Sequence, residues 1–86
     1  MARRASAITA FRRFLPEHFQ SSRAQFDEIR SVVKSNFPKL CDDAKLCTHE
    51  SPYRPEWEHQ LRYALDYLKN KQKLISQDRH GEYIFP

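Results

Sequence analysis

One stretch decides the fold: residues 54–73, with the sequence RPEWEHQLRYALDYLKNKQK. Its apolar residues recur at the spacing of one face of an α-helix, and they are Trp57, Leu61, Ala64, Leu65 and Leu68. Pro55 favours the first helical turn, where its missing N–H would have no partner, and Glu56 complements the helix dipole. The stretch therefore predicts a long helix with one side in a hydrophobic core.

Two short strands are expected after this helix. Residues 74–76 and 82–85 are rich in apolar side chains, and they flank the segment 77–81. Gly81 can adopt the positive φ that a bulged hairpin turn requires. A long helix followed by a hairpin with a basic tip is typical of the C-terminal half of a winged helix.

Two further helices are predicted upstream. Ser22 with Gln25 forms a capping-box pattern before an apolar stripe, which indicates a helix over residues 22–36. Pro38 ends that helix, and the apolar residues after it predict a short second helix over 38–46. The next residues contain two prolines without periodicity and are interpreted as a connector.

The predicted fold class is therefore mainly α with a small β-hairpin. Residues 16–86 are expected to form a winged helix-turn-helix of three helices plus a wing, separated by Pro16 from a basic N-terminal arm over residues 1–15. A single small domain of 86 residues leaves little room for a deep catalytic cleft, and its 40% apolar residues suffice for a core. The composition favours a binding module.

The net charge of +4 lies in the arm, which contains no acidic residue and carries Arg3, Arg4, Arg12 and Arg13. Such an arm attracts polyanions such as DNA or RNA, although a solvated basic terminus accounts for the charge equally well. The arm faintly resembles a mitochondrial transit peptide, but Ile8, Phe11 and Leu15 also predict a short amphipathic helix that docks on the domain. We favour the docked helix.

The side of the long helix opposite its apolar stripe carries the candidate DNA contacts. A recognition helix enters the major groove with its N-terminal half towards the base edges. The candidates on or just before the helix are Arg54, His59, Arg62 and Tyr63; those at the hairpin tip are Arg79 and His80, and those in the arm are Arg12 and Arg13. The alternative interpretation is a merely solvated helix face.

Catalysis and metal binding are not expected for this chain. Five residues lie between Cys41 and Cys47, and His49 is close by, which departs from the spacing of structural zinc sites, so no metal or other cofactor is predicted. No group supplies a nucleophile, a base and an oxyanion site together. The sequence has no membrane span or secretory signal, and a cytoplasmic, nucleoid-associated protein with reduced thiols is expected.

The run from Arg54 to Lys71, with Leu74-Ile75 and the tip from Arg79 to Tyr83, resembles the winged-helix modules of modification-dependent restriction endonucleases, of the Mrr-type, HNH and methyladenine-dependent kinds. The resemblance covers roughly residues 48–85. It implies a reader of double-stranded DNA, including methylated DNA, that is carried by or works with a nuclease domain or subunit. By position it implies Trp57 as a core or pocket residue, and as DNA contacts Arg54, His59, Arg62, Tyr63 and Arg79.

This chain departs from that family's pattern at two points: Gln72 and one more residue stand where the family usually has Gly, and His80 is inserted before Gly81.

A base methyl group in the major groove would contact an aromatic side chain, for which Tyr63 and Tyr53 are available. Burying one methyl is worth about 0.8 kcal/mol. The competing class is a winged-helix protein-interaction or dimerisation domain, because Tyr and Arg are also favoured at protein interfaces.

Overall fold

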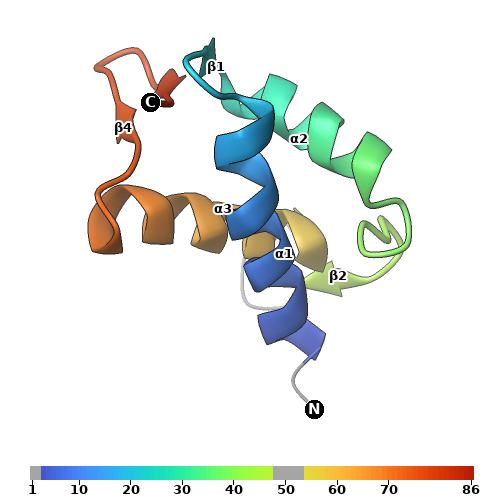
Figure 1. Cartoon of the computed structure of the whole chain (residues 1–86). Coiled ribbons are helices and arrows are strands. Elements are labelled where there is room, and N and C mark those ends of the chain that lie inside the picture. The colour runs from blue at the N-terminus through green and yellow to red at the C-terminus, as the bar shows by residue number, and fades with distance from the viewer. Residues whose placement is uncertain (1–2, 48–53) are drawn as a thin grey trace.

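The computed structural model describes residues 3–47 and 54–86, which form three α-helices and a three-stranded antiparallel sheet (Figure 1). The elements in chain order are α1 (Arg3–His18), β1 (Arg23–Ala24), α2 (Phe26–Asn36), β2 (Leu46–Cys47), β3 (Arg54–Pro55), α3 (Glu56–Asp66), the π-helical turn η1 (Tyr67–Lys71), β4 (Ser76–Gln77) and β5 (Tyr83–Ile84). This described part is mainly helical, and its arrangement is compatible with a winged-helix-like fold.

The long helix is confirmed as α3 with its continuation η1, and its predicted apolar stripe lies in the core. The buried side chains of that stripe are Trp57, Leu61, Ala64, Leu65 and Leu68. The wider turn η1 ends the helix, where the N–H of Gln72 donates to the carbonyl of Tyr67 at 3.0 Å. Lys73 then adopts a φ of 52°, which reverses the chain towards the sheet.

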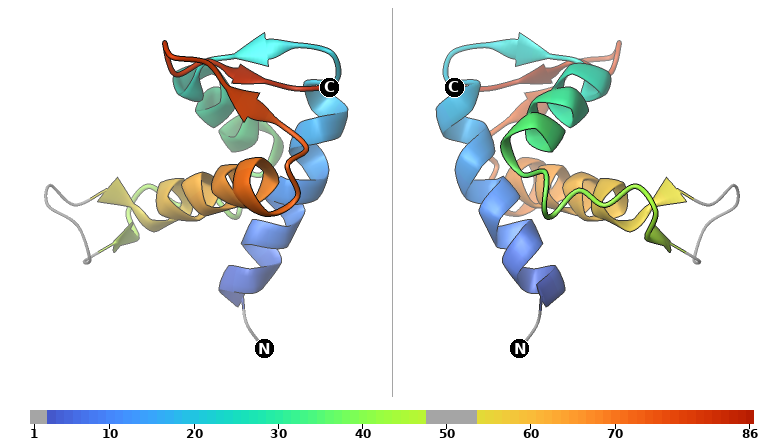
Figure 2. Two further views of the ribbon diagram at one scale, coloured as in Figure 1. Left: turned by 90° about the vertical axis from the view of Figure 1, so that its left-hand side faces the viewer. Right: turned by 90° about the vertical axis from the view of Figure 1, so that its right-hand side faces the viewer.

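The predicted hairpin is present as β4 and β5, in which Gln77 pairs with Tyr83. Its first strand begins later than predicted, at Ser76, because the N–H groups of Leu74 and Ile75 donate to the carbonyl of Leu68 instead. A third strand, β1, pairs with the other edge of β5, so the strand order is β1-β5-β4. This strand was not predicted, because two residues are too short to show the alternation of a strand. Figure 2 shows the sheet lying across the end of α1, on the same side of α3 as α2.

The N-terminal residues form a helix that packs into the domain, as the amphipathic pattern predicted. Phe11 and Leu15 of α1 are fully buried against the core, and Ile8 is partly buried. Pro16 does not end this segment, because α1 continues to His18 and is held by the buried side chain of Phe19 just beyond it. The predicted boundary between residues 15 and 16 therefore falls inside one helix.

Two of the predicted helix features are wrong. Residues 38–45 contain turns and a bend instead of a helix, and Leu46 begins β2, because Asp42 folds back on its neighbours: its carboxylate accepts the N–H of Ala44 at 3.0 Å and its carbonyl that of Lys45 at 3.2 Å. Ser22 does not cap α2, whose N-cap is Gln25 without a side-chain hydrogen bond. The carbonyl of Ser22 instead accepts the N–H of Phe85, which extends the sheet.

The predicted connector begins and ends in paired strands. Leu46 of β2 faces Pro55 of β3, and Cys47 faces Arg54, in antiparallel register. Figure 2 shows these strands projecting from the body of the molecule at the N-terminal end of α3. Tyr53 and His49 lie outside the described residues.

Candidate nucleic-acid interface

The polar side of α3 is open to solvent. Arg62 and Asp66 are exposed, His59 is half-buried, and 61% of Tyr63 is accessible. The rings of His59 and Tyr63 meet edge to face with centroids 5.7 Å apart. These four residues combine hydrogen-bond donors, acceptors and an aromatic surface on one helix side, while the opposite side forms the core. The set has the chemistry that base edges in a groove require.

Arg62 is oriented by a contact with α2. Its guanidinium carbon lies 4.1 Å from the centroid of the Phe26 ring, at the first residue of α2. Such stacking engages the face of the guanidinium and leaves its edge N–H groups free to donate in the guanidinium plane. Arg62 is therefore held at the flank of α3 nearest α2, while its donors remain at the surface.

The other flank of α3 is covered by α1. The guanidinium carbon of Arg12 lies 4.1 Å from the centroid of the Tyr67 ring in η1, and Arg12 Nε is buried without a hydrogen-bond partner in the described part of the chain. Arg13, the next residue, is exposed. The arginines of α1 are consequently attached to the domain beside α3 rather than carried on a separate arm.

The hairpin between β4 and β5 has a turn organised by Asp78. Its Oδ1 accepts the N–H of His80 at 2.9 Å and that of Glu82 at 3.0 Å. Gly81 closes the turn with a φ of 86°, a region that side-chain-bearing residues rarely adopt. Arg79 and His80 are exposed at the tip. The hydrogen-bonded turn thus holds the backbone of Arg79 and His80 in place, while both side chains extend into solvent.

The acidic groups of the hairpin are compensated from β1. Arg23 Nη2 contacts Asp78 Oδ2 at 3.1 Å, and Arg23 Nε contacts Glu82 Oε1 at 3.0 Å. The amide of Glu82, then that of His80 and the charge of Arg23, hold the pKa of Asp78 below its ordinary value. The hairpin is tied to η1 as well, because Lys69 Nζ donates to Gln77 Oε1 at 2.9 Å.

The acids at the start of α3 are also paired. Glu58 accepts a 2.7 Å hydrogen bond from Arg30 of α2, whose guanidinium lies 5.1 Å from the Trp57 ring centroid. Glu56 lies 4.0 Å from the ammonium of Lys45. The negative charge at this end of α3 is therefore partly cancelled, which lowers its repulsion of a phosphate backbone.

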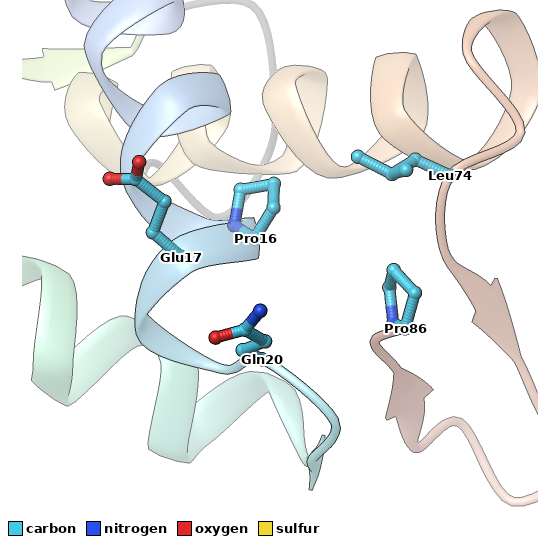
Figure 3. A pocket seen from close by; sticks show the side chains of 5 residues that line it. All are labelled: Pro16, Glu17, Gln20, Leu74 and Pro86. Atoms are coloured by element: carbon cyan, nitrogen blue, oxygen red, sulfur yellow. The ribbon is translucent and has the colours of Figure 1, made fainter.

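A shallow hollow lies elsewhere on the molecule, between the end of α1, the segment after η1 and the last residue (Figure 3). It has a volume of about 580 Å³, and its lining residues are Pro16, Glu17, Gln20, Leu74 and Pro86. Among these described residues only Glu17 is ionisable. The lining side chains therefore offer one carboxylate and no thiol, hydroxyl or imidazole.

Metal-binding clusters are absent from residues 3–47 and 54–86: no three side chains of His, Cys, Asp or Glu lie close enough together to hold an ion. Cys41 is buried, and burial raises the pKa of its thiol to about 11.

None of the helices in residues 3–47 and 54–86 combines the length and apolar character needed to cross a lipid bilayer.

The structure places the predicted residues on α3, α1, the hairpin tip and β3. His59, Arg62 and Tyr63 are on its open side, Arg12 and Arg13 on α1, and Arg79 and His80 on the hairpin tip. The backbone of Arg54 is in β3, and its side chain lies outside the described part. Sequence reasoning missed the aromatic supports Phe26 and Tyr67 and the pairing role of Arg23, because each contact joins segments far apart in the chain.

Comparisons of the chain with protein-family models, with curated proteins and with solved structures found no match.

Proposed function

We propose that this chain is a winged-helix module that binds double-stranded DNA, with α3 in the major groove and the β4–β5 hairpin as the wing. The observation that supports this most directly is the open side of α3. Tyr63 is 61% exposed there, with Arg62 stacked at one flank and Arg12 at the other. A core helix that is merely solvated has no requirement for two stacked arginines beside an exposed aromatic residue.

The groove chemistry assigns a role to each side chain. B-DNA's major groove is about 12 Å wide and admits one helix, so the open side of α3 would meet base edges. Tyr63 supplies apolar contact to a base methyl group, Asp66 accepts from a base amino group, and Arg62 donates to guanine or phosphate. Arg12 and Arg13 of α1 contact phosphates, which sets the register of the helix.

The wing completes the footprint in this proposal. Arg79 and His80 at its tip contact a neighbouring phosphate or minor groove, and the fixed turn limits the entropy lost on binding. The exposed ring of Tyr63 could also contact the methyl group of a methylated base. We therefore extend the proposal to a module that recognises methylated DNA on behalf of a nuclease domain or subunit. The module itself supplies binding rather than catalysis.

A salt titration of duplex binding tests this proposal. The expected result is an association constant whose logarithm falls linearly with the logarithm of salt concentration, with a slope of about −4 to −6. This slope corresponds to about four to seven neutralised phosphates, which the arginines and lysines around α3 can supply. Comparing methylated and unmethylated duplexes of one sequence then tests the methyl-reading extension separately.

The competing function is a protein-interaction or dimerisation domain, which the exposure of Tyr63 also favours, because exposed tyrosines are enriched at protein interfaces. Size-exclusion chromatography with light scattering distinguishes the two functions. Self-association together with absent or salt-insensitive DNA binding would support the interaction domain and contradict the DNA-binding proposal.

A further inference from the structure

Arg23 occupies an unusual position at the base of the hairpin tip. It belongs to β1, which pairs with β5, and its guanidinium reaches both arms of the hairpin: Nη2 contacts Asp78 Oδ2 at 3.1 Å, and Nε contacts Glu82 Oε1 at 3.0 Å. The residues between these two acids are Arg79, His80 and Gly81. One side chain therefore spans the two ends of the tip.

The two oxygens of Asp78 have different tasks. Oδ1 accepts the backbone N–H groups of His80 and Glu82, which fixes the turn, while Oδ2 faces Arg23. Two backbone hydrogen bonds also close the turn: the N–H of Asp78 donates to the carbonyl of Glu82 at 3.0 Å, and the N–H of Gly81 donates to the carbonyl of Asp78 at 3.0 Å. The turn can thus form without Arg23, but its attachment to β1 and its charge balance depend on that residue.

The charge balance matters because two carboxylates flank the tip. Without a counter-charge they would oppose the approach of a phosphate to Arg79 and His80, at separations within the screening length of about 8–10 Å at physiological salt. Arg23 adds one positive charge between them, and both of its contacting nitrogens are used in these pairs. Two of the three guanidinium nitrogens, Nη2 and Nε, are therefore engaged by the hairpin.

We propose that Arg23 is a positioning residue for the wing: it orients the tip against β1 and offsets half of the negative charge of Asp78 and Glu82, so that Arg79 and His80 can contact the DNA backbone. This inference rests on the proposed DNA-binding function. A positioning role and a direct phosphate contact make different predictions. If Arg23 acts only through Asp78 and Glu82, it becomes dispensable once both acids are removed; if Arg23 itself contacts phosphate, it does not.

The test uses a charge cycle in the full chain: Arg23→Gln, the pair Asp78→Asn with Glu82→Gln, and the three changes together. Asp78→Asn retains the Oδ1 acceptor for the turn. We expect Arg23→Gln to weaken duplex binding about three- to tenfold, and the triple variant, whose tip is one charge unit more positive than that of the wild type, to bind at least as tightly as the wild type. Unchanged binding by Arg23→Gln would overturn the inference, as would a triple variant as weak as Arg23→Gln.

Hydrogen exchange of the free protein separates this inference from the proposed function. The amides of His80 and Glu82 should exchange faster in Arg23→Gln than in the wild type, whether or not the chain binds DNA; unchanged exchange overturns the positioning role. A wild-type chain that binds no duplex overturns the proposed function instead. Arg23→Lys, which keeps the charge without the two-pronged geometry, should bind with intermediate affinity, and wild-type affinity would contradict the need for that geometry.

Discussion

The guanidinium of Arg62 lies over the ring of Phe26, with its central carbon 4.1 Å from the ring centroid, so the candidate recognition helix is joined to the first residue of α2. A cation–π contact at an exposed site contributes about 0.5–1 kcal/mol. More important for binding, the ring limits the orientations of a side chain that would otherwise be mobile. The contact makes Phe26 a support for the proposed DNA-binding surface.

Replacing Phe26 by Leu should therefore weaken DNA binding without unfolding the protein. The leucine retains apolar bulk but not the ring, so we expect duplex affinity to fall about two- to fivefold, measured by fluorescence anisotropy. Phe37→Leu is the matched control, because Phe37 is also partly buried but packs on Phe11 and Phe14 of α1. Equal losses of affinity in the two variants would contradict this role of Phe26.

Asp43 should make the stability of the domain depend on acidity. The ammonium of Lys34, and then the indole N–H of Trp57 at 2.9 Å, hold the pKa of Asp43 below its ordinary value of 3.8. A carboxyl group with a lowered pKa in the folded state adds stability above its unfolded pKa, and this contribution is lost as the pH falls through its folded pKa. Stability should therefore decrease on acidification below about pH 4.

Asp43→Asn isolates that contribution, because asparagine keeps an oxygen acceptor for Trp57 but carries no charge. The wild type should be the more stable protein at neutral pH, and its advantage should shrink progressively as the pH falls below about 4. Urea unfolding followed by the fluorescence of Trp57, the single tryptophan, measures both. An advantage that persists unchanged at the acidic pH would rule out this explanation.

Cys41 should be unreactive in the folded protein. Its thiol is buried, and burial raises its pKa to about 11, so the reactive thiolate is scarce at neutral or mildly alkaline pH. In a Cys47→Ser variant, which leaves Cys41 as the single cysteine, a thiol reagent should label the protein only after urea is added. Labelling of the native variant at the rate of a free thiol would contradict the buried position.

Lys73 adopts a left-handed conformation with a φ of 52° directly after η1. The left-handed conformation costs a residue with a side chain about 1–2 kcal/mol, and replacing Lys73 by glycine would remove this cost. Part of that stabilisation would be lost, because glycine is more flexible than lysine in the unfolded chain. Lys73→Gly should therefore raise the free energy of unfolding by about 0.5–1 kcal/mol in urea titrations. Lys71→Gly, inside η1, should lower it, and stabilisation by both changes would argue against a conformational cause.

The long helix and the hairpin could be predicted because their signals are local. The periodic spacing from Trp57 to Leu68 reports directly which side of α3 is buried, and Gly81 marks the turn between β4 and β5. The docking of α1 was predicted for the same reason, from Phe11 and Leu15 at helical spacing.

The remaining features depend on partners distant in the sequence. The segment 38–46 has helix-compatible apolar residues, but Asp43 is bound to Lys34 and Trp57, and Asp42 forms a turn. Neither contact is visible as a period in the sequence. The candidate surface likewise combines Arg62 with Phe26 and Arg12 with Tyr67, pairs that are brought together only by the folded chain.

The affinity of duplex DNA for Arg62→Ala and Tyr63→Ala, compared with the wild type, tests the central claim most directly. Both residues lie on the open side of α3, and each loss should cost about 1–3 kcal/mol of binding, or about five- to 150-fold, while thermal unfolding remains cooperative and stability falls by no more than about 1 kcal/mol for Arg62→Ala. Lys39→Ala, at an exposed lysine beyond the end of α2, is the control for loss of charge. Wild-type affinity in both α3 variants would contradict the claim that α3 reads DNA.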